Sequence, residues 1–462
     1  MTANQSITPV SYAVSPEGQA TLAGIPLTQL AQSYGTPLYV LDAATITAVA
    51  QAYTQTLTQH YPAPHRVLYA SKANLNVGLA KFLASLGLGF DVVSGGELAT
   101  VLAAGVDPKT LCFNGNNKSS QELDDALAAG VGRITVDNPD ELTLLVERIR
   151  AKRLHQPNFG SVPILLRVTP GIDCHTHHYI RTGQVDSKFG FNVSDILPTI
   201  QNIIGPWASE LQLCGLQAHI GSQIFEHQAY LDLVGFFAAQ YDQIRAQTGL
   251  VFTDLNVGGG IGVAYTATDD PLAIDTTVAA IAKAVVNAFT EIAYPLPRLL
   301  MEPGRSLIAT AGMTLYTVGG QKHIPFAGLA PDMAQMFPQG RTYWAVDGGM
   351  GDNIRPALYQ AQYTAVVANK ANLPATTPVT IAGKYCESGD ILFPAIPLPP
   401  LERGDTLAVM TTGAYNYSMA SAYNRMPRAA MVLVNPEGTS AEAVQPLVRR
   451  ETAADMLAQD VI

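Results

Sequence analysis

The chain has 462 residues, of which 48% are hydrophobic and 14% are charged, and its formal net charge is −10. This composition excludes a disordered chain, and the acidic balance argues against a nucleic-acid partner because phosphate backbones are bound by clustered Lys and Arg. No apolar run approaches the roughly 20 residues that span a bilayer, and residues 1–18 lack a signal-peptide pattern, so we expect a cytoplasmic protein without a membrane partner.

The predicted elements begin with a strand at 38–41, inside an N-terminal segment that we place at 1–43. From 44 to 305, short β-branched runs then alternate with amphipathic stretches. The predicted strands cover 67–71, 89–94, 110–114, 133–137, 163–168, 215–220, 254–257 and 298–302. The predicted helices between them cover 77–86, 97–104, 121–129, 139–151, 229–247 and 277–292. Eight such units predict a closed parallel (β/α)8 barrel, and an open Rossmann-like sheet is the alternative.

After residue 305 the helical period ends, and 306–462 is predicted to be an all-β domain of the sandwich or barrel type. Its predicted strands cover 313–318, 343–346, 363–368, 379–382, 406–411 and 430–434. The N-terminal strand is expected to complete this β domain from the other end of the chain. Residues 321–341 are interpreted as a long inserted loop.

Polar residues follow the predicted barrel strands, at the ends where barrel enzymes carry their chemistry. They are Lys72, Asp91, Ser94, Asn114, Asp137, Arg167, His219, Ser222, Gly258, Gly259, Gly260, Glu302 and Arg305. The glycine run and the segment Pro303-Gly304-Arg305 follow strands seven and eight, where barrels often bind phosphate. A lysine after strand one can lose its proton in an apolar site and attack an aldehyde, although a surface lysine is the alternative.

Metal binding is not predicted. The cysteines at 112, 174, 214 and 386 are too widely spaced for a zinc site or a disulfide framework. The cluster Cys174, His175, His177 and His178 is the metal-site alternative, but ligands crowded within five positions cannot easily surround one tetrahedral ion. A loop is the preferred interpretation there.

Several motifs in chain order resemble the fold-type III pyridoxal-phosphate decarboxylases. These motifs are Tyr69-Ala70-Ser71-Lys72-Ala73-Asn74, Phe90–Leu98, His219–Gln223, Gly258–Gly260, Glu302–Arg305, Asp347–Met350 with Arg355, Cys386–Asp390 and Gly413–Tyr415. Residues 170–190 and 413–424 are similar to the diaminopimelate-specific subgroup, although Asn416 and Ala422 depart from its usual pattern.

The resemblance implies that Lys72 carries pyridoxal 5′-phosphate and that Cys386 protonates the α-carbon after carbon dioxide leaves. It assigns cofactor contacts to Asp91, His219, Ser222, Gly258, Gly259, Gly260, Glu302, Gly304, Arg305 and Tyr415. It assigns substrate contacts to Arg305, Arg355, Tyr359, Glu387 and Tyr415. A core histidine at His219, local hydrogen bonding by Asp91, a Glu302–Arg305 salt bridge and a surface salt bridge at Arg355 are the alternatives.

The resemblance further implies a carboxy-lyase that converts the amino-acid substrate meso-2,6-diaminopimelate to L-lysine, and a homodimer with shared active sites. A decarboxylase for ornithine, arginine or carboxynorspermidine on the same scaffold remains an alternative. A non-catalytic cofactor carrier and a racemase are further alternatives, but the β domain and the Cys386-Glu387 pair argue against the carrier, and the surrounding motif argues against the racemase.

Overall fold

The computed structural model describes residues 2–172, 187–435 and 443–461, and these residues divide into two compact units. The barrel unit contains residues 49–262 and 271–307, and the β unit contains residues 1–48, 263–270 and 308–462. The segment 263–270 therefore belongs to the β unit, although it lies inside the continuous stretch that the sequence predicts for the barrel.

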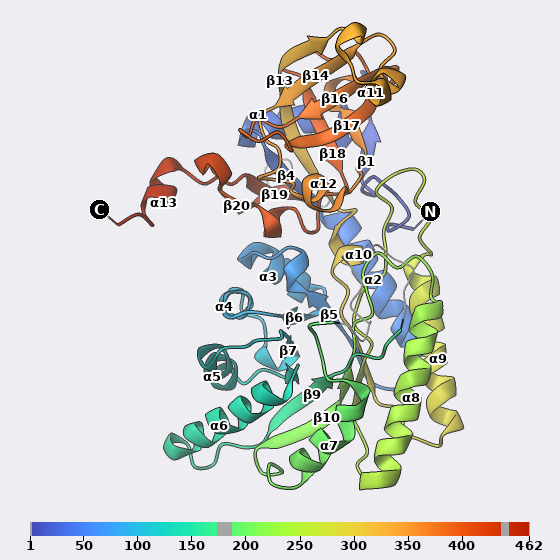
Figure 1. The fold of residues 1–462 in the computed structure, drawn as a ribbon, viewed down its shortest axis with the longest axis vertical. Helices are drawn as coiled ribbons and strands as arrows, with labels where there is room; N and C mark the ends of the chain where they lie inside the picture. Colours follow the sequence, from blue (N-terminus) through green and yellow to red (C-terminus); the bar gives the residue numbers. More distant parts are fainter. Residues whose placement is uncertain (1, 173–186, 436–442, 462) are drawn as a thin grey trace. The chain divides into compact units, whose positions relative to one another are not determined.

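Eight parallel strands follow one another around a barrel in the order β5 to β12, and the pairing of β12 with β5 closes it (Figure 1). They are β5 His65–Ala70, β6 Gly89–Val92, β7 Leu111–Phe113, β8 Arg133–Val136, β9 Val162–Arg167, β10 Leu211–Gln217, β11 Asp254–Asn256 and β12 Arg298–Met301. The predicted barrel is confirmed, and the open-sheet alternative is wrong because a closed sheet has no free edge.

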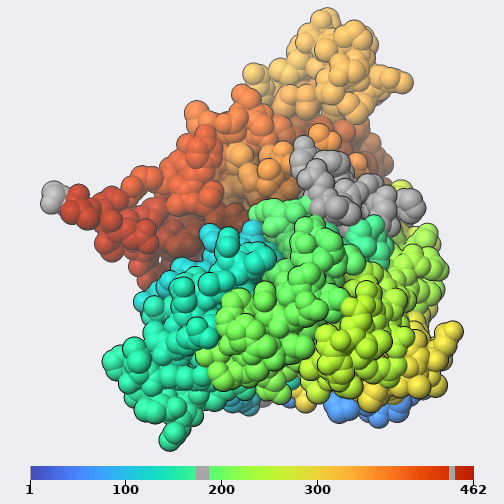
Figure 2. All heavy atoms as spheres, turned by 60° about the horizontal axis from the view of Figure 1, so that its bottom comes forward, coloured from blue at the N-terminus to red at the C-terminus, as the bar shows by residue number. Residues whose placement is uncertain are grey.

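Helices follow the barrel strands along the chain, and in Figure 2 the colours of α6 to α9 succeed one another across the outside of the barrel. Their bounds are α2 Ala43–His60, α3 Val77–Ser85, α4 Gly95–Ala103, α5 Ser120–Ala129, α6 Pro139–His155, α7 Val193–Ile204, α8 Gln228–Thr248 and α9 Ile274–Glu291. Local signals set two of the starts. Ser119 forms a capping box with Glu122, and Asn138 caps the helix that opens with Pro139.

The β unit is built on a nine-stranded mixed sheet. Its strands are β4 Leu38–Asp42, β13 Gly312–Ile324, β14 Arg341–Val346, β15 Ala365–Val367, β16 Thr377–Ala382, β17 Ile391–Leu398, β18 Thr406–Met410, β19 Ala430–Val434 and β20 Val444–Val448. Strand β4 pairs with β13 on one side and with β19 on the other, so the N-terminal segment completes this sheet as predicted. Buried side chains of β4, β13, β18 and β19 share one apolar core.

The interpretation of residues 321–341 as a loop is wrong in part. Strand β13 continues to Ile324 and pairs with β14 from Gln321↔Trp344 to Ile324↔Arg341. Helix α11 (Pro331–Met336) lies between the two strands in the chain. The guanidinium of Arg341 lies 5.4 Å from the ring centre of Phe337 and 4.3 Å from that of Tyr343, so cation–π contacts accompany the pairing.

The remaining elements are short. They are β1 Tyr12–Val14, β2 Ala20–Leu22, β3 Ile25–Pro26, α1 Leu27–Tyr34, α10 Arg305–Ile308, α12 Arg355–Tyr359, α13 Ala453–Leu457 and several 3-10 turns. In the parts of the chain that the structure describes, no helix combines the length and the apolar character needed to cross a membrane.

Candidate active site

Glu302, which follows β12, is the most heavily hydrogen-bonded of the predicted site residues. Its side chain is buried, and amide groups donate to both of its oxygens. Asn114 Nδ2 lies 3.0 Å and Asn256 Nδ2 2.7 Å from Oε1, and Gln217 Nε2 lies 3.0 Å from Oε2. Its recorded partners are therefore amides from the ends of three other strands, an arrangement that fixes an acceptor carboxylate rather than the predicted alternative of a salt bridge.

Asp91, on β6, lies in the same network. The side-chain amide of Asn114 donates to Asp91 Oδ1 as well as to Glu302, so a single NH2 group bridges the two carboxyl groups. Burial and the nearby charge of Glu302 raise the pKa of Asp91 to about 8, while the positive charge of Lys72 opposes the shift. Asp91 is therefore largely protonated at neutral pH, which avoids placing two charged carboxylates side by side.

Lys72 lies in a 3-10 turn, Ser71–Ala73, directly after β5, and its side chain is exposed. Its charge also acts on Glu97 and His219, so the ammonium group lies among residues from the ends of several strands. The backbone N–H of Ala70 donates to the carbonyl of Pro303, and this bond joins the ends of β5 and β12. The first and last strands of the barrel thereby bring Lys72 and Glu302 to the same end.

His219 follows β10 and lies partly buried above the barrel end. Its Nδ1 accepts the backbone N–H of Gly259 at 3.4 Å, which leaves Nε2 as the protonated nitrogen of a neutral ring. Burial, together with the positive charges of Lys72 and Arg167, lowers the pKa of His219 well below its usual value. The imidazole is therefore neutral at physiological pH and suited to lie flat against an aromatic ring.

The glycines after β11 permit a very close approach of three loops. A Cβ on Gly259 would lie 2.0 Å from the carbonyl oxygen of Glu302, and Gly258 and Gly260 have positive φ angles of 68° and 115°. Gly258 N–H donates to Asn256 Oδ1 at 2.9 Å. That N–H therefore orients the side chain that supports Glu302, so Gly259 and Gly260 are the better placed of the three to meet an anion.

Arg305 and Ser222 come together on the same side of the barrel. Arg305 opens α10 and is buried, and its Nε and Nη2 lie 3.2 and 3.1 Å from Ser222 Oγ. Gly304 packs closely, because a Cβ there would lie 3.1 Å from the Cβ of Ala70. A guanidinium, a hydroxyl and glycine N–H groups are the donors that proteins use for phosphate.

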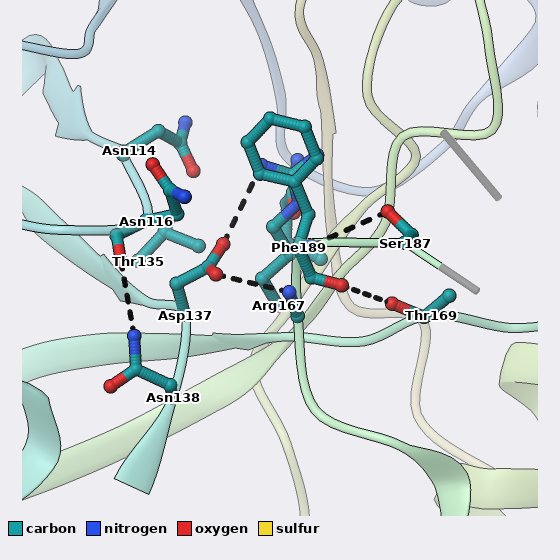
Figure 3. Close-up of polar contacts among 12 residues, drawn as sticks. Asn114, Asn116, Thr135, Asp137, Asn138, Arg167, Thr169, Ser187 and Phe189 are labelled. Atoms are coloured by element: carbon teal, nitrogen blue, oxygen red, sulfur yellow. Dashed lines mark hydrogen bonds and ion pairs between the residues drawn. The ribbon is translucent and has the colours of Figure 1, made fainter. Parts of the chain in front are cut away.

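Asp137 directly follows β8 and Arg167 ends β9, and both contact the chain at Phe189 or Gly190 (Figure 3). Asp137 Oδ2 accepts Gly190 N–H at 3.0 Å, and Arg167 Nη1 lies 3.5 Å from Asp137 Oδ1. The Arg167 guanidinium also lies 4.3 Å from the ring centre of Phe189. The histidine cluster at 175–178, with Cys174, lies outside the described residues.

A second group of predicted residues lies in the β unit, and Arg355 is the most buried of them. It opens α12, donates to the hydroxyl of Tyr363, and lies 4.9 Å from the ring centre of Tyr265. The surface salt bridge considered for Arg355 is therefore wrong. Tyr359 ends the same short helix four positions later and is partly exposed, so it lies on the same helical face.

Cys386 and Glu387 are exposed in a tight turn of the β unit. Asp390 fixes the turn: its carboxylate accepts hydrogen bonds from the backbone N–H groups of Tyr385 at 3.0 Å and Met350 at 2.7 Å. Cys386 N–H donates to Asn424 Oδ1 at 2.8 Å. Two sequence motifs are thus tied together, and the thiol is left accessible. Tyr415, which is partly exposed, follows β18 with a positive φ of 59°.

Comparisons with known proteins agree with this geometry. Residues 44–309 match the family model described as pyridoxal-dependent decarboxylase, pyridoxal binding domain. The chain is 43% identical to a diaminopimelate decarboxylase of Synechocystis, covering 99% of this chain and 94% of the relative, and 43% identical to that of Bacillus subtilis, covering 96% and 95%. The chain belongs to the diaminopimelate decarboxylase family.

The solved structure of a diaminopimelate decarboxylase from M. jannaschii, in complex with L-lysine, superposes on this member of the family with a TM-score of 0.85. It is 30% identical and covers 100% of this chain and 99% of that one. A lysine/ornithine decarboxylase from Vibrio vulnificus shares the fold with a TM-score of 0.71 at 24% identity.

The cofactor of this diaminopimelate decarboxylase family member is pyridoxal 5′-phosphate, and the barrel end fits that group. The amine of Lys72 suits its aldehyde, the Glu302 carboxylate suits a protonated ring nitrogen, and Arg305 with Ser222 suits its phosphate. In addition, Asn114 Oδ1 and Gln217 Oε1 are buried beside Glu302 without a hydrogen-bond partner among the residues that the structure describes. Such orphaned acceptors are expected where a polar ligand completes the site.

Sequence reasoning missed two residues of this site, Gln217 and Asn256. Both end buried strands, and Asn114 directly follows one; a polar side chain at the end of a buried strand is the signal that could have identified them. Among the described residues, no group of three or more His, Cys, Asp and Glu side chains is arranged to hold a metal ion.

Proposed function

We propose that this protein decarboxylates meso-2,6-diaminopimelate to L-lysine and carbon dioxide, the last step of lysine biosynthesis. The observation that carries the proposal is the 43% identity with diaminopimelate decarboxylases over almost the whole of both chains. That identity includes the β unit, where all the predicted substrate contacts except Arg305 lie, as well as the barrel.

In this proposal the barrel residues bind and orient the cofactor. Lys72 would hold it through its amine, and Arg305, Ser222 and the glycine loop would hold its phosphate. When bound, pyridoxal 5′-phosphate draws into its ring the electron pair that the departing carboxylate leaves behind. Glu302, fixed by its amide donors, holds the proton on the ring nitrogen, and neutral His219 covers the ring face.

Cys386 completes the reaction by delivering the thiol proton to the α-carbon after the bond to the carboxylate breaks. Its exposure in a rigid turn supports this role, because a proton donor must reach the substrate and be reprotonated from water. Arg355 and Glu387 are assigned to the distal carboxylate and ammonium groups of diaminopimelate, with Tyr359 and Tyr415 beside them.

Incubation of the cofactor-loaded protein with meso-diaminopimelate, with detection of lysine and carbon dioxide, tests the proposal directly. We expect stoichiometric release of both products. Ornithine, arginine and carboxynorspermidine form the comparison panel, and we expect them to be turned over at least about a hundredfold less efficiently because they lack the distal zwitterion. Efficient turnover of one of these substrates without lysine formation from diaminopimelate would contradict the assignment.

We also propose a homodimer whose two active sites each combine Lys72 of one subunit with Cys386 of the other. The exposed Cys386 and its location in a different unit from Lys72 support this arrangement. Mixing inactive Lys72→Ala and Cys386→Ala variants tests it. Random reassociation would give mixed dimers with one intact site, and hence about a quarter of the wild-type activity. No recovery of activity, with dimers present, would contradict site sharing.

A cytoplasmic location remains part of the proposal, because the substrate and product are small metabolites of amino-acid synthesis. Cell fractionation with an antibody against the protein tests it. Recovery in the membrane or secreted fraction would contradict it.

A further inference from the structure

The barrel unit contains a cavity at the end of the strands opposite Lys72. It has a volume of about 480 Å³ and is lined by residues from the starts of β5, β7, β8 and β12 and from the turn before β7. His65 opens β5 at this cavity, whereas Lys72 follows the other end of the same strand. With a rise of about 3.3 Å per residue, the two ends lie roughly 20 Å apart.

The floor of the cavity is apolar. Leu68, Cys112 and Leu300 line it, and they belong to a buried cluster with Leu165 and Cys214 inside the barrel. Barrel interiors are usually filled by layers of bulky branched side chains. This cluster contains two cysteines, which are smaller than such side chains, and one of them, Cys112, lines the cavity.

The rim of the cavity is basic, in a protein whose net charge is −10. Four strongly basic side chains line the cavity with one acidic side chain, and they are Arg66, Lys109, Arg133 and Arg298 with Asp107. Asp107 Oδ1 accepts a hydrogen bond from the backbone N–H of Lys109 at 3.0 Å. His65 also lines the rim, and its ring faces Thr58 and the carbonyl of Ala63.

Part of this basic rim has a structural role. Arg133 Nε lies 2.6 Å from Asp254 Oδ2, and Arg298 Nη1 lies 3.8 Å from Asp254 Oδ1. Because β8 and β11 are not neighbours in the barrel, the Arg133–Asp254 ion pair links two strands that do not pair with each other, at this end of the barrel. This role does not extend to Arg66 and Lys109, which are exposed and form none of the ion pairs found among the described residues.

We infer that this cavity is a binding site for a small organic anion, with a carboxylate or phosphate group held by Arg66 and Lys109 and an apolar part directed at the Leu68–Cys112–Leu300 floor. Cavities of this volume accommodate drug-sized and metabolite-sized ligands. The site is separate from the proposed active site, and the inference does not depend on the identity of the substrate.

Calorimetric titration of the cofactor-loaded protein tests the inference. The probes are phenyl phosphate and phenylacetate, which carry the two head groups, with inorganic phosphate and the neutral phenylacetamide for comparison. We expect one of the two aromatic anions to bind more tightly than inorganic phosphate and phenylacetamide, and their order distinguishes a phosphate site from a carboxylate site. Equal binding of phenylacetamide, or of inorganic phosphate, would overturn the inference.

Two variants locate the binding. Arg66→Gln/Lys109→Gln removes two exposed cations without breaking a recorded ion pair, and we expect about tenfold or greater weakening of aromatic-anion binding. Lys81→Gln/Lys283→Gln, which removes two exposed lysines of α3 and α9, is the matched control and should bind as the wild type does. Equal weakening in both double variants would show general charge attraction and overturn the site.

Ala63→Trp tests the cavity while leaving every cation in place. Ala63 lines the cavity and is partly exposed, so an indole there would fill part of the hollow. We expect the advantage of the aromatic anion over inorganic phosphate to disappear. If the thermal midpoint and the aromatic-anion affinity of this variant both match the wild type, the apolar part of the inference is wrong.

Discussion

The two groups of predicted site residues differ in how they are held. In the barrel unit, Glu302 is buried and receives three amide hydrogen bonds from three other strand ends. In the β unit, Cys386 and Glu387 are exposed on a turn whose backbone is fixed by Asp390. The difference matches the roles proposed above: a carboxylate fixed in the barrel is suited to electrostatic control of a cofactor, whereas exposed groups on a turn are suited to reach a substrate and exchange protons with water.

Among the substitutions that test this difference, Glu302→Gln should have the largest effect on kcat. We expect kcat to fall on the order of a hundredfold or more, because the amide cannot favour a protonated ring nitrogen and its NH2 group faces the donors of Asn114 and Asn256 or that of Gln217. Steady-state kinetics of the cofactor-loaded protein measures the effect. Glu97→Gln is the matched control, since Glu97 is also near Lys72 but accepts the backbone N–H of Val93 at 2.7 Å. Comparable kcat values for the two variants would contradict the special role of Glu302.

Replacement of cysteine by serine separates the exposed turn from the buried barrel. Cys386→Ser should lower kcat about a hundredfold with little change in thermal midpoint, because a hydroxyl is a poor proton donor and the side chain is exposed. Cys112→Ser should lower the thermal midpoint with little change in kcat, because Cys112 is buried in the barrel, where burial also raises the pKa of its thiol. A Cys386→Ser variant with wild-type turnover would remove Cys386 from the mechanism.

Asn256→Ala tests whether the amide hydrogen bonds to Glu302 contribute to catalysis. The change removes one donor to Glu302 and the acceptor for Gly258 N–H, so we expect kcat to fall about tenfold and the free energy of unfolding to drop by about 1–3 kcal/mol. Denaturant unfolding and steady-state kinetics give the two values. Asn138→Ala, at the cap of α6, is the control that should lose stability alone. If Asn256→Ala lost stability but kept its kcat, the amide hydrogen bond from Asn256 to Glu302 would have a structural role only.

The pH dependence of stability tests the raised pKa of Asp91, and this change is not expected to involve the catalytic rate. The pKa of Asp91 is raised to about 8 by burial and Glu302, so the folded protein binds a proton that the unfolded chain, with a pKa near 4, releases. Between these values the wild type should lose stability as pH rises, by up to about 1.4 kcal/mol per pH unit relative to Asp91→Asn. Denaturant unfolding of both cofactor-free proteins at pH 5 to 8 measures the difference. A difference that stays constant or grows with pH would contradict a raised pKa.

Much of the barrel could be predicted because its signals are local. Alternating strand and helix patterns located all eight barrel strands, and Ser119 and Asn138 marked helix starts through their capping chemistry. Helix α7 was missed because Pro198 interrupts its pattern, although the apolar face remains buried. Strand β17 was missed because Pro394 and Pro397 argue against a central strand; it lies at the edge of the sheet, where proline is tolerated.

The site was less predictable because its geometry depends on closure of the barrel. Asn114, Gln217 and Asn256 are separated by up to 142 positions from each other in the chain, and only the pairing of β10, β11 and β12 and the closed order of the strands direct their amides to one carboxylate. The prediction of a loop at residues 321–324 was wrong for a similar reason. This end of β13 is stabilised by its pairing with β14 and by cation–π contacts, which a local pattern does not reveal.

The covalent attachment of the cofactor to Lys72 is the central claim, and borohydride reduction of the cofactor-loaded protein followed by peptide mapping tests it most directly. We predict a stable pyridoxyl label on the peptide containing Lys72, and no such label in a folded Lys72→Ala variant. A label on another lysine, or none on well-folded protein supplied with pyridoxal 5′-phosphate, would contradict the account.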